Sequence, residues 1–391
     1  MNVRMVCEFL GRLPWDESAF ALGVAGGLAA RGHRVKVFTD GAEDTLVPAG
    51  VEMIMRDVRR RRHQRQPFAF ARWARARLDE DPSSVGLSFS RLVPSDLWLP
   101  IGPAESAIAR RVVKGHPLSA AMELVVRPWL ATSPMAERRA GSSVSAQRLD
   151  ADHTDLVGAT LRRPPDLADR AARLRALLRL GSARPGVLLP TTHTERAGFW
   201  AAVEGCAHAA RTLRSQGRSL RVLLAGKHAA TVTRRASAIG LAANLDPLGA
   251  IVPLSDALAA CDLCLVPTLG GRGRASEGTG RLLADALHHA TPVVAWHTAP
   301  GAQVLREHPA SGRLVPDPDD AASSAPAVRF GEQIAALLEP GARRAASEAA
   351  AALSPTLDPE LLYDRIETRL RTIEASASPA RGDRVRARGR I

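Results

Sequence analysis

Short apolar runs and longer amphipathic stretches alternate along the chain, as strands and helices do in α/β proteins. The first forty residues show the pattern clearly. NVRMVCEF is a short apolar run, AFALGVAGGLAARG is an alanine-rich helix that ends at Gly32, and HRVKVFTD alternates as a strand does. Asp16 or Ser18 can cap the start of this helix, and a glycine suits its end. So compact a strand–helix–strand unit predicts two parallel strands.

The same alternation continues through the first half of the chain. Strands are predicted at 52–57 and 85–92, with a helix between them from about Phe68 to Leu78. Residues 103–129 have the pattern of a basic amphipathic helix, which packs its apolar stripe on the domain core or lies on a membrane surface. Residues 142–165 are polar and less patterned.

A second series begins after a predicted helix at 167–181. Its strands and helices alternate from Val187 to Trp296, in the order VLLP, FWAAVEGCAHAARTLRSQG, SLRVLLAG, AATVTRRASAIG, ANLDPLGAIVP, SDALAAC, DLCLVPT, RLLADALHHA and PVVAW. DPELLYDRIETRLRTIEA is a terminal helix, and the tail after it has too few apolar residues to fold by itself.

These patterns predict an α/β protein of two Rossmann-like, doubly wound domains that face each other across a cleft. A length of 391 residues suits two domains. The expected bounds are 1–165 for the N-terminal domain, 166–357 for the C-terminal domain, 358–375 for a terminal helix that packs back on the N-terminal domain, and 376–391 for a basic disordered tail. Open parallel sheets bind ligands at the carboxyl ends of their strands, which favours a nucleotide-type ligand between the domains.

The net charge of +13 comes almost wholly from arginine. RDVRRRRHQRQ at 56–66 and ARGDRVRARGRI at 380–391 are densely basic. Such surfaces are simply solvated, or they attract anionic lipid or acidic polymers. With one tyrosine and no basic run interleaved with aromatic residues, the chain lacks the stacking platforms of single-strand binders, so no nucleic-acid partner is expected.

The chain is expected to be cytoplasmic, with a peripheral position at the inner face of the membrane as a use of its basic surface. No apolar run reaches the roughly 18 to 20 residues that cross a bilayer. The first run meets Pro14 and Asp16 too early for a signal peptide. Cys261 and Cys264 have C-x-x-C spacing but no second pair or nearby histidine cluster, so no metal site is expected.

Most of the candidate chemistry lies in PTLGGRGRASEGTGRLLADALHHATPVVAW, residues 267–296. Five glycines between 270 and 280 precede a helix, so backbone N–H groups can approach a phosphate and the helix dipole favours the anion. Glu277 lies just before this helix and Asp285 about two turns into it. Such a pair of carboxylates accepts hydrogen bonds from vicinal hydroxyls well. Nearby positive charge comes from Arg272, Arg274 and Arg281.

SEGTGRLLADAL followed by ATPVVA resembles the signature of the family 4 retaining glycosyltransferases, in which two acidic residues separated by seven others precede a small-x-Pro-Val-Val strand. LAARGHRVKVFTD, LLAGKH, LGAIVPLSDALAACDLCLVPT and SGRLVPDPDD resemble other passages of that family. FARWARARL with DPSSVGLSFSRLVPSDLW is similar in particular to lipopolysaccharide core glucosyltransferases. The resemblance extends over most of residues 1–340 and is most specific over 221–296.

The resemblance implies a GT-B fold and a hexosyltransferase-like enzyme. Such an enzyme transfers a sugar, with retention, from a uridine or guanosine diphosphate to a cell-envelope or lipid-linked saccharide acceptor. The N-terminal domain would be the acceptor side and the C-terminal domain the nucleotide-sugar side. No metal or other cofactor is expected, because basic side chains and helix-end N–H groups stabilise the departing diphosphate.

The resemblance also implies roles for individual residues. Glu277 contacts the donor sugar, and Asp285 binds the ribose. Arg196 is the second catalytic residue, since an arginine can hold a diphosphate through two hydrogen bonds. The remaining donor-binding residues are Gly278, Thr279, Gly280, Arg281 and Lys227.

Three departures from the family pattern leave other functions open. Asp285 stands where the family usually has Glu, and Ala197 follows Arg196 where the family has an Arg/Lys pair. The first loop, GRLPWDESAF, has Trp15 and Asp16 in place of a Gly-Gly turn, and these two residues form the predicted acceptor-side loop. One alternative is therefore a homologue that binds a nucleotide sugar or a partner without turnover. Another is a basic polyanion-binding protein on the same fold.

Overall fold

The computed structural model describes most of the chain. The residues outside the description are 8, 11–16, 43–46, 57–65, 82, 91–92, 94, 99–160, 192–193, 195–197, 227, 250–251, 270–280, 300, 319–325 and 389–391. The amphipathic helix predicted at 103–129 and most of the polar stretch at 142–165 therefore fall outside it.

The chain divides into two compact units. The first unit consists of Met1–Arg12, Glu17–Leu156 and Tyr363–Ile391, and the second of Leu13–Asp16 and Val157–Leu362. The chain thus enters the second unit a few residues before the boundary expected near 165. The reason is local, because Leu161 already packs against the hydrophobic core of the second unit.

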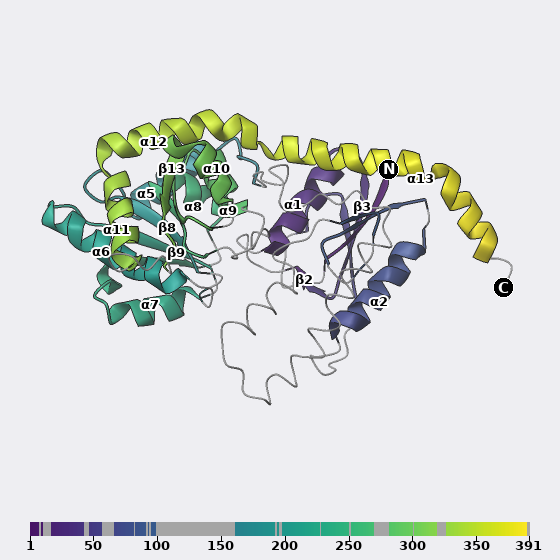
Figure 1. Cartoon of the computed structure of the whole chain (residues 1–391), viewed down its shortest axis with the longest axis horizontal. Coiled ribbons are helices and arrows are strands. Elements are labelled where there is room, and N and C mark those ends of the chain that lie inside the picture. The colour runs from purple at the N-terminus through teal and green to yellow at the C-terminus, as the bar shows by residue number, and fades with distance from the viewer. Residues whose placement is uncertain are drawn as a thin grey trace. The chain divides into compact units, whose positions relative to one another are not determined.

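The first unit is built on a five-stranded sheet in the order β5-β3-β1-β6-β7 (Figure 1), and every pairing in it is parallel. Its strands are β1 (Asn2–Val6), β3 (Arg34–Thr39), β5 (Val51–Met55), β6 (Val85–Ser88) and β7 (Leu97–Trp98). Two helices accompany them, α1 (Glu17–Ala30) and α2 (Gln66–Asp79), with a small parallel pair of β2 (Phe9–Leu10) and β4 (Gly41–Ala42).

The strand order explains where the two helices lie. From β1 the chain steps outward to β3 and β5, then returns past β1 to β6. Because such parallel connections are right-handed, α1 and α2 cover opposite faces of the sheet, as Figure 1 shows. Phe70 and Ala74 of α2 pack on Val6 and Phe38 of the strands. The strands predicted at 52–57 and 85–92 and the helix predicted near 68–78 are confirmed.

The terminal helix α13 (Pro359–Arg388) belongs to the first unit from Tyr363 onward. The ring of Tyr363 lies against α1 at Gly27, where a Cβ atom would be 2.6 Å from the ring carbons. Two contacts join the turn after α1 to the same terminal helix, an ion pair of Arg31 with Asp364 at 2.8 Å and a polar contact of His33 with Glu367 at 3.1 Å. The helix docks on α1 because a glycine leaves room for the tyrosine ring.

The structure continues α13 to Arg388, where the sequence predicts a disordered tail from 376. That prediction is corrected for 376–388. Pro379 and Gly382 disfavour a helix interior, so local propensity does not account for this extension of the helix.

The second unit has a six-stranded sheet in the order β10-β9-β8-β11-β12-β13, again with parallel pairings. The strands are β8 (Gly186–Pro190), β9 (Arg221–Ala225), β10 (Leu245–Gly249), β11 (Leu263–Val266), β12 (Val293–Trp296) and β13 (Gly312–Val315). The side chains of β11 and β12 are buried along their whole length, as expected for strands covered on both faces.

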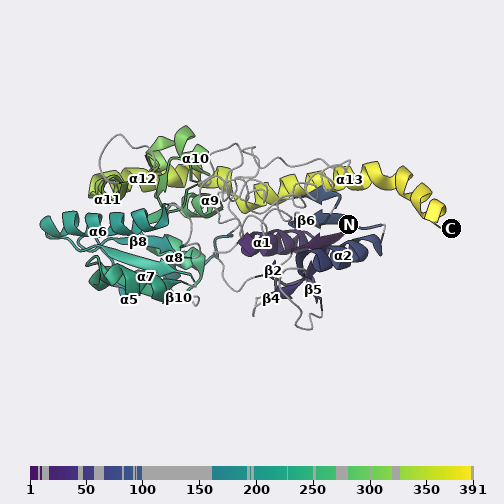
Figure 2. The same ribbon diagram turned by 60° about the horizontal axis from the view of Figure 1, so that its bottom comes forward.

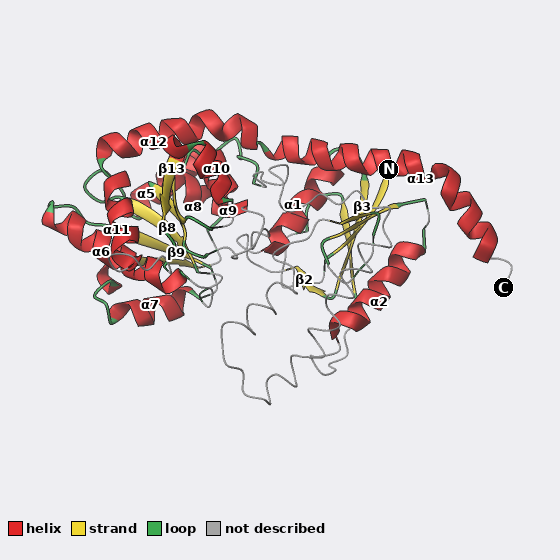
Figure 3. Ribbon diagram, viewed as in Figure 1, coloured by secondary structure: helices red, strands yellow, loops and turns green. Residues whose placement is uncertain are grey.

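Helices cover both faces of this sheet. They are α5 (Leu167–Leu177), α6 (Phe199–Ser215), α7 (Ala229–Ser237), α8 (Leu254–Ala260), α9 (Arg281–His288), α10 (Ala302–Glu307), α11 (Pro326–Leu337) and α12 (Pro340–Leu353), with short 3-10 turns at Ala242–Asn244, Pro309–Ser311 and Ser354–Leu357. Figure 2 shows α6 and α11 on one side of the strands and α5 on the other, and Figure 3 marks the alternation of helix and strand.

The predicted fold class, two α/β units with parallel sheets, is confirmed. The alternation predicted from Val187 to Trp296 is also confirmed. The helix predicted over 167–181 ends earlier, at Leu177, because the chain turns there and Arg179 adopts a positive φ of 53°. Sequence pattern did not identify α11 or α12.

Gly27→Ala tests the docking of α13. Alanine favours an isolated helix, but here its methyl group would meet the Tyr363 ring, so we expect a net loss of about 1–3 kcal/mol in the free energy of unfolding. Urea unfolding measures it. Gly341→Ala is the matched control, because it also lies in a helix and a Cβ there meets nothing within 4 Å. Equal stabilities of the two variants would contradict this packing role.

Candidate functional site

The strand order of the second unit reverses between β8 and β11. From β8 the chain steps outward to β9 and β10, then crosses to β11 and steps the other way to β12 and β13. The two central strands are hydrogen-bonded neighbours, with Leu263 opposite Val187 and Cys264 opposite Leu188. At such a reversal the two outgoing connections diverge at the carboxyl ends, which opens a crevice for ligands. The topology therefore places the candidate site where β8 and β11 end.

Two connections leave this point. One leads from the end of β8 to Gly198 and the start of α6, and the other from the end of β11 to Arg281 and the start of α9. The predicted residues Arg196, Glu277, Gly278, Thr279 and Gly280 belong to these connections and lie outside the described residues. Their flanking elements nevertheless meet at the reversal, as a shared donor site requires.

Three other predicted site residues also lie outside the described part of the chain. Lys227 follows the carboxyl end of β9, a neighbour of β8. Trp15 and Asp16, the predicted acceptor-side loop, precede α1 of the first unit. Their roles remain predictions.

Asp285 and Arg281 are the predicted site residues that the structure describes. Both lie on α9 and are buried, and Arg281 Nε is 3.1 Å from Asp285 Oδ2. The other carboxylate oxygen of Asp285 accepts a hydrogen bond of 3.1 Å from the backbone N–H of Leu161. Leu161 follows closely on the point where the chain enters the second unit. The ribose contact of Asp285 stays a prediction, and the structure adds a role for this carboxylate in holding the entering segment.

Sequence reasoning missed that second role. Its one local signal is the spacing of Arg281 and Asp285, because residues four apart lie on the same helix face and form ion pairs there. The contact with Leu161 has a sequence separation of 124, so no local pattern reports it.

Two histidines complete α9. The Nδ1 atom of His289 lies 2.7 Å from the carbonyl oxygen of Asp285, and Nδ1 of His288 lies 3.1 Å from that of Ser354. Burial lowers the pKa of His289 to about 4 and also lowers the pKa of His288. Both rings are therefore neutral at pH 7. The ring of His288 joins the end of α9 to Ser354, whereas the ring of His289 lies against a carbonyl of α9 itself.

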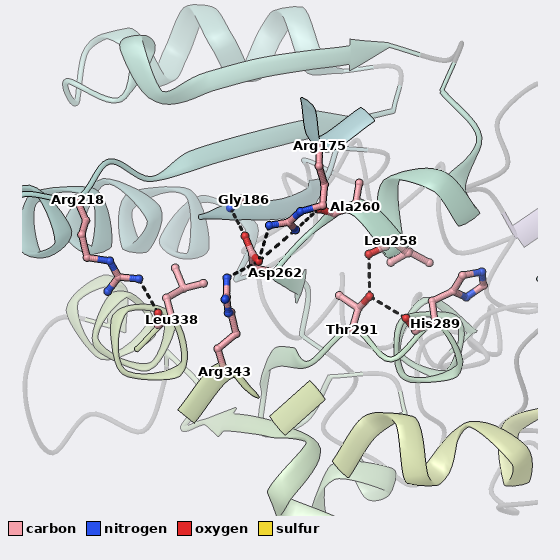
Figure 4. Close-up of polar contacts among 10 residues, drawn as sticks. All are labelled: Arg175, Gly186, Arg218, Leu258, Ala260, Asp262, His289, Thr291, Leu338 and Arg343. Atoms are coloured by element: carbon pink, nitrogen blue, oxygen red, sulfur yellow. Dashed lines mark hydrogen bonds and ion pairs between the residues drawn. The ribbon is translucent and has the colours of Figure 1, made fainter. Parts of the chain in front are cut away.

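A buried carboxylate lies at the amino ends of the central strands, opposite the candidate site. Asp262 immediately precedes β11, and its side chain accepts hydrogen bonds from three segments (Figure 4). Its Oδ2 accepts from Gly186 N at 2.7 Å, while Oδ1 accepts from Arg343 at 2.6 Å and from Arg175 at 3.2 Å. Arg175 also donates to the carbonyl oxygen of Ala260 at 2.6 Å. One carboxylate thus holds the amino end of β8, helix α5 and helix α12 to the start of β11.

The four cysteines are not reactive groups of this site. Cys7, Cys206, Cys261 and Cys264 are all buried thiols. Burial raises the pKa of Cys261 and Cys264, so both are protonated at neutral pH. Among the residues the structure describes, no cluster of three or more His, Cys, Asp or Glu has the arrangement of a metal site.

The family relationship is carried by the C-terminal half of the chain. Residues 196–330 match the family model described as "Glycosyl transferases group 1". This range includes the end of the first connection and the whole of the second, together with α6, α9 and the strands from β9 to β13. Residues 196–330 are a group 1 glycosyltransferase domain. The predicted class of enzyme, a glycosyltransferase, is confirmed.

Solved glycosyltransferases share the fold of nearly the whole chain. WaaG, a glycosyltransferase involved in lipopolysaccharide biosynthesis, superposes with a TM-score of 0.69 at 17% identity, over 93% of this chain and 98% of its own. HepE of Anabaena, in complex with UDP and glucose, gives 0.59 at 15% identity, over 95% and 100%. A glycosyltransferase from Rickettsia africae gives 0.57 at 13% identity, over 95% and 98%. These likenesses establish the two-domain GT-B fold.

No curated protein matches the chain by sequence. Within the described residues, no helix combines the length and the apolar character needed to span a bilayer.

Asp262→Asn tests the buried carboxylate. Removing one charge of a buried ion-pair cluster leaves Arg175 and Arg343 without their common partner, so we expect a loss of about 3–5 kcal/mol in the free energy of unfolding. Urea unfolding of the purified variant measures it. Glu348→Gln is the control, because its pair with Arg344 is exposed and worth at most about 1 kcal/mol. Equal losses in the two variants would contradict the role given to Asp262.

His289 predicts how stability depends on pH. Its pKa is about 4 in the folded protein and near 6.5 in the unfolded chain, so below pH 6.5 the unfolded chain binds the extra proton. Stability is therefore retained above pH 6.5 and falls as the pH drops toward 4, by up to about 1.4 kcal/mol per pH unit. Urea unfolding at pH 7.5 and pH 5 measures the loss. His289→Gln should lose less stability over this interval than the wild type, and an identical loss would exclude His289 as a source.

Proposed function

We propose that the chain is a retaining glycosyltransferase that moves a sugar from a nucleoside-diphosphate donor to a cell-envelope or lipid-linked saccharide acceptor. One observation carries the proposal. The two connections that diverge at the β8–β11 reversal contain Arg196 and the segment from Glu277 to Gly280, and these residues fall within the range 196–330 that matches the group 1 glycosyltransferase model.

The chemistry of these residues suits a departing diphosphate. Negative charge develops on the diphosphate as the bond to the sugar breaks. The glycines before α9 let backbone N–H groups reach the phosphates at the positive end of the helix, and Arg196 and Lys227 add cationic donors. Glu277 then faces the donor sugar. These groups supply the charge stabilisation, so the proposal includes no metal or other cofactor.

A uridine diphosphate sugar is the first donor to test, because the solved structure of HepE holds UDP and glucose. The acceptor proposal follows the involvement of WaaG in lipopolysaccharide biosynthesis. Trp15 and Asp16, which precede α1, would contact this acceptor. We place the reaction in the cytoplasm, at the inner face of the membrane, where the basic stretches 56–66 and 380–391 would meet anionic lipid.

A second candidate is a homologue that binds the donor without turnover. Besides the changed first loop, it is favoured by the contacts of Asp285, whose two oxygens already accept from Arg281 and from Leu161 N–H. A carboxylate held in this way is less available for a ribose.

Calorimetric titration with UDP- and GDP-sugars, followed by a transfer assay with glycolipid acceptors, separates the candidates. Donor binding together with transfer supports the glycosyltransferase, and donor binding without transfer or donor hydrolysis supports the second candidate. Failure to bind any donor, alongside salt-dependent binding to anionic vesicles, would exclude both in favour of a polyanion-binding protein.

Glu277→Ala tests the site directly. If Glu277 contacts the donor sugar, transfer should fall by at least about a hundredfold, because the variant loses a carboxylate placed against the positive charge that develops on the sugar as its bond to the diphosphate breaks. Initial rates of sugar transfer measure this, with donor binding followed by calorimetry. Glu307→Ala is the control, since Glu307 is an exposed carboxylate of the same domain. Unchanged turnover in Glu277→Ala would remove Glu277 from the mechanism.

A further inference from the structure

One tryptophan contacts both of the connections that leave the reversal, where the candidate site lies. Trp296 is the last residue of β12 and is fully buried. Its indole Nε1–H donates a hydrogen bond of 2.9 Å to the carbonyl oxygen of Pro267, the first residue after β11. The side chain therefore fixes the chain where it leaves β11 for the glycine-rich connection.

The same indole also borders the start of α6. Gly198 precedes this helix with a φ of +84°, and a Cβ atom there would lie 2.6 Å from Trp296 Nε1. It would also lie 3.0 Å from Cγ of Leu269, close behind Pro267 in the chain. Only glycine fits both the backbone conformation and the space. The entry to α6, Trp296 and the exit from β11 are thus packed into direct contact.

The indole is itself held from the opposite side. The ring of Phe330 on α11 lies 4.6 Å from the ring of Trp296, with 44° between their planes. Helix α11 is in turn closely seated on α6, because a Cβ at Gly331 would lie 2.5 Å from the carbonyl oxygen of Gly205. The indole ring therefore packs against a helix that is closely seated on α6, while its N–H is held separately by the carbonyl of Pro267.

We propose that Trp296 is a positioning residue for the nucleoside-diphosphate donor. This inference rests on the proposed function. Gly198 and Leu269 lie at the ends of the two connections that carry Arg196 and Glu277. One side chain contacts both of those ends, so it fixes the spacing of the two segments from which the proposed donor site is built. A small displacement of such a site weakens binding disproportionately, because the donor must satisfy both connections together.

The hydrogen bond separates this role from simple filling of the core. A phenylalanine at position 296 would keep the aromatic contact with Phe330 but would lose the N–H donor to Pro267. Phe330→Leu does the reverse, because it removes the ring contact and leaves the indole N–H and the Pro267 carbonyl in place. The two variants therefore form a matched pair, because each removes one of the two contacts of the indole and keeps the other.

The experiment compares Trp296→Phe, Phe330→Leu and the wild type. UDP and a UDP-sugar are titrated by calorimetry, stability is measured by urea unfolding, and steady-state rates give the Michaelis constants for donor and acceptor. We expect Trp296→Phe to weaken UDP binding by about tenfold and to raise the donor constant without changing the acceptor constant. Phe330→Leu should lose similar stability and bind UDP as the wild type does. Equal UDP affinities in the two variants would overturn the proposal.

Hydrogen exchange of the ligand-free proteins keeps this test separate from that of the proposed function. If Trp296 ties the two connections together, Trp296→Phe should speed exchange in peptides containing Gly198 and Leu269 more than Phe330→Leu does. Equal exchange in the two variants would refute the link itself. If the wild type binds no donor while the two variants still differ in hydrogen exchange, the proposed function is refuted. Trp296 then remains the residue that ties these two segments together.

Discussion

The second unit depends on one buried carboxylate. Asp262 accepts hydrogen bonds from a strand N–H and from two arginines on separate helices, and all of these donors lie far from it in sequence. A carboxylate out of contact with water is tolerated only when such partners compensate its charge. Burial of Asp262 therefore requires α5, β8 and α12 to be in place together. These contacts fix the amino ends of the two central strands, β8 and β11.

Because charged contacts hold the amino ends of these two strands, their carboxyl ends are left for ligand binding. The connections after β8 and β11 diverge there, since the order of the sheet reverses between these strands. The contacts described at that edge are of another kind, a tryptophan indole packed against a glycine and a backbone carbonyl. An apolar side chain with a single donor can hold two segments without adding charge beside an anionic ligand. The amino ends of the central strands thus serve stability, and their carboxyl ends serve binding.

Helix α9 joins these functions. Its first residue follows the glycine-rich connection, and its last turn carries two neutral, buried histidines. Between them, Asp285 accepts a hydrogen bond from the segment by which the chain enters the second unit. One carboxylate therefore links α9 to the segment at Leu161. Glu277 and Asp285 therefore differ in their setting. Glu277 belongs to the glycine-rich connection, whereas Asp285 is buried on α9.

By itself the sequence determined the fold class and the neighbourhood of the site. Buried parallel strands need continuous apolar runs such as LCLV and VVAW, and a phosphate-binding turn needs glycines before a helix, so both leave local patterns. It did not determine α11, whose place depends on close contact between Gly205 and Gly331, or the partners of Asp262 and Asp285. The long-range contacts among these join residues from 76 to 126 positions apart, as with Gly186 and Asp262 or Gly331 and Gly205. Only the tertiary structure decided them, because burial and hydrogen bonding over such separations arise when the whole chain has folded.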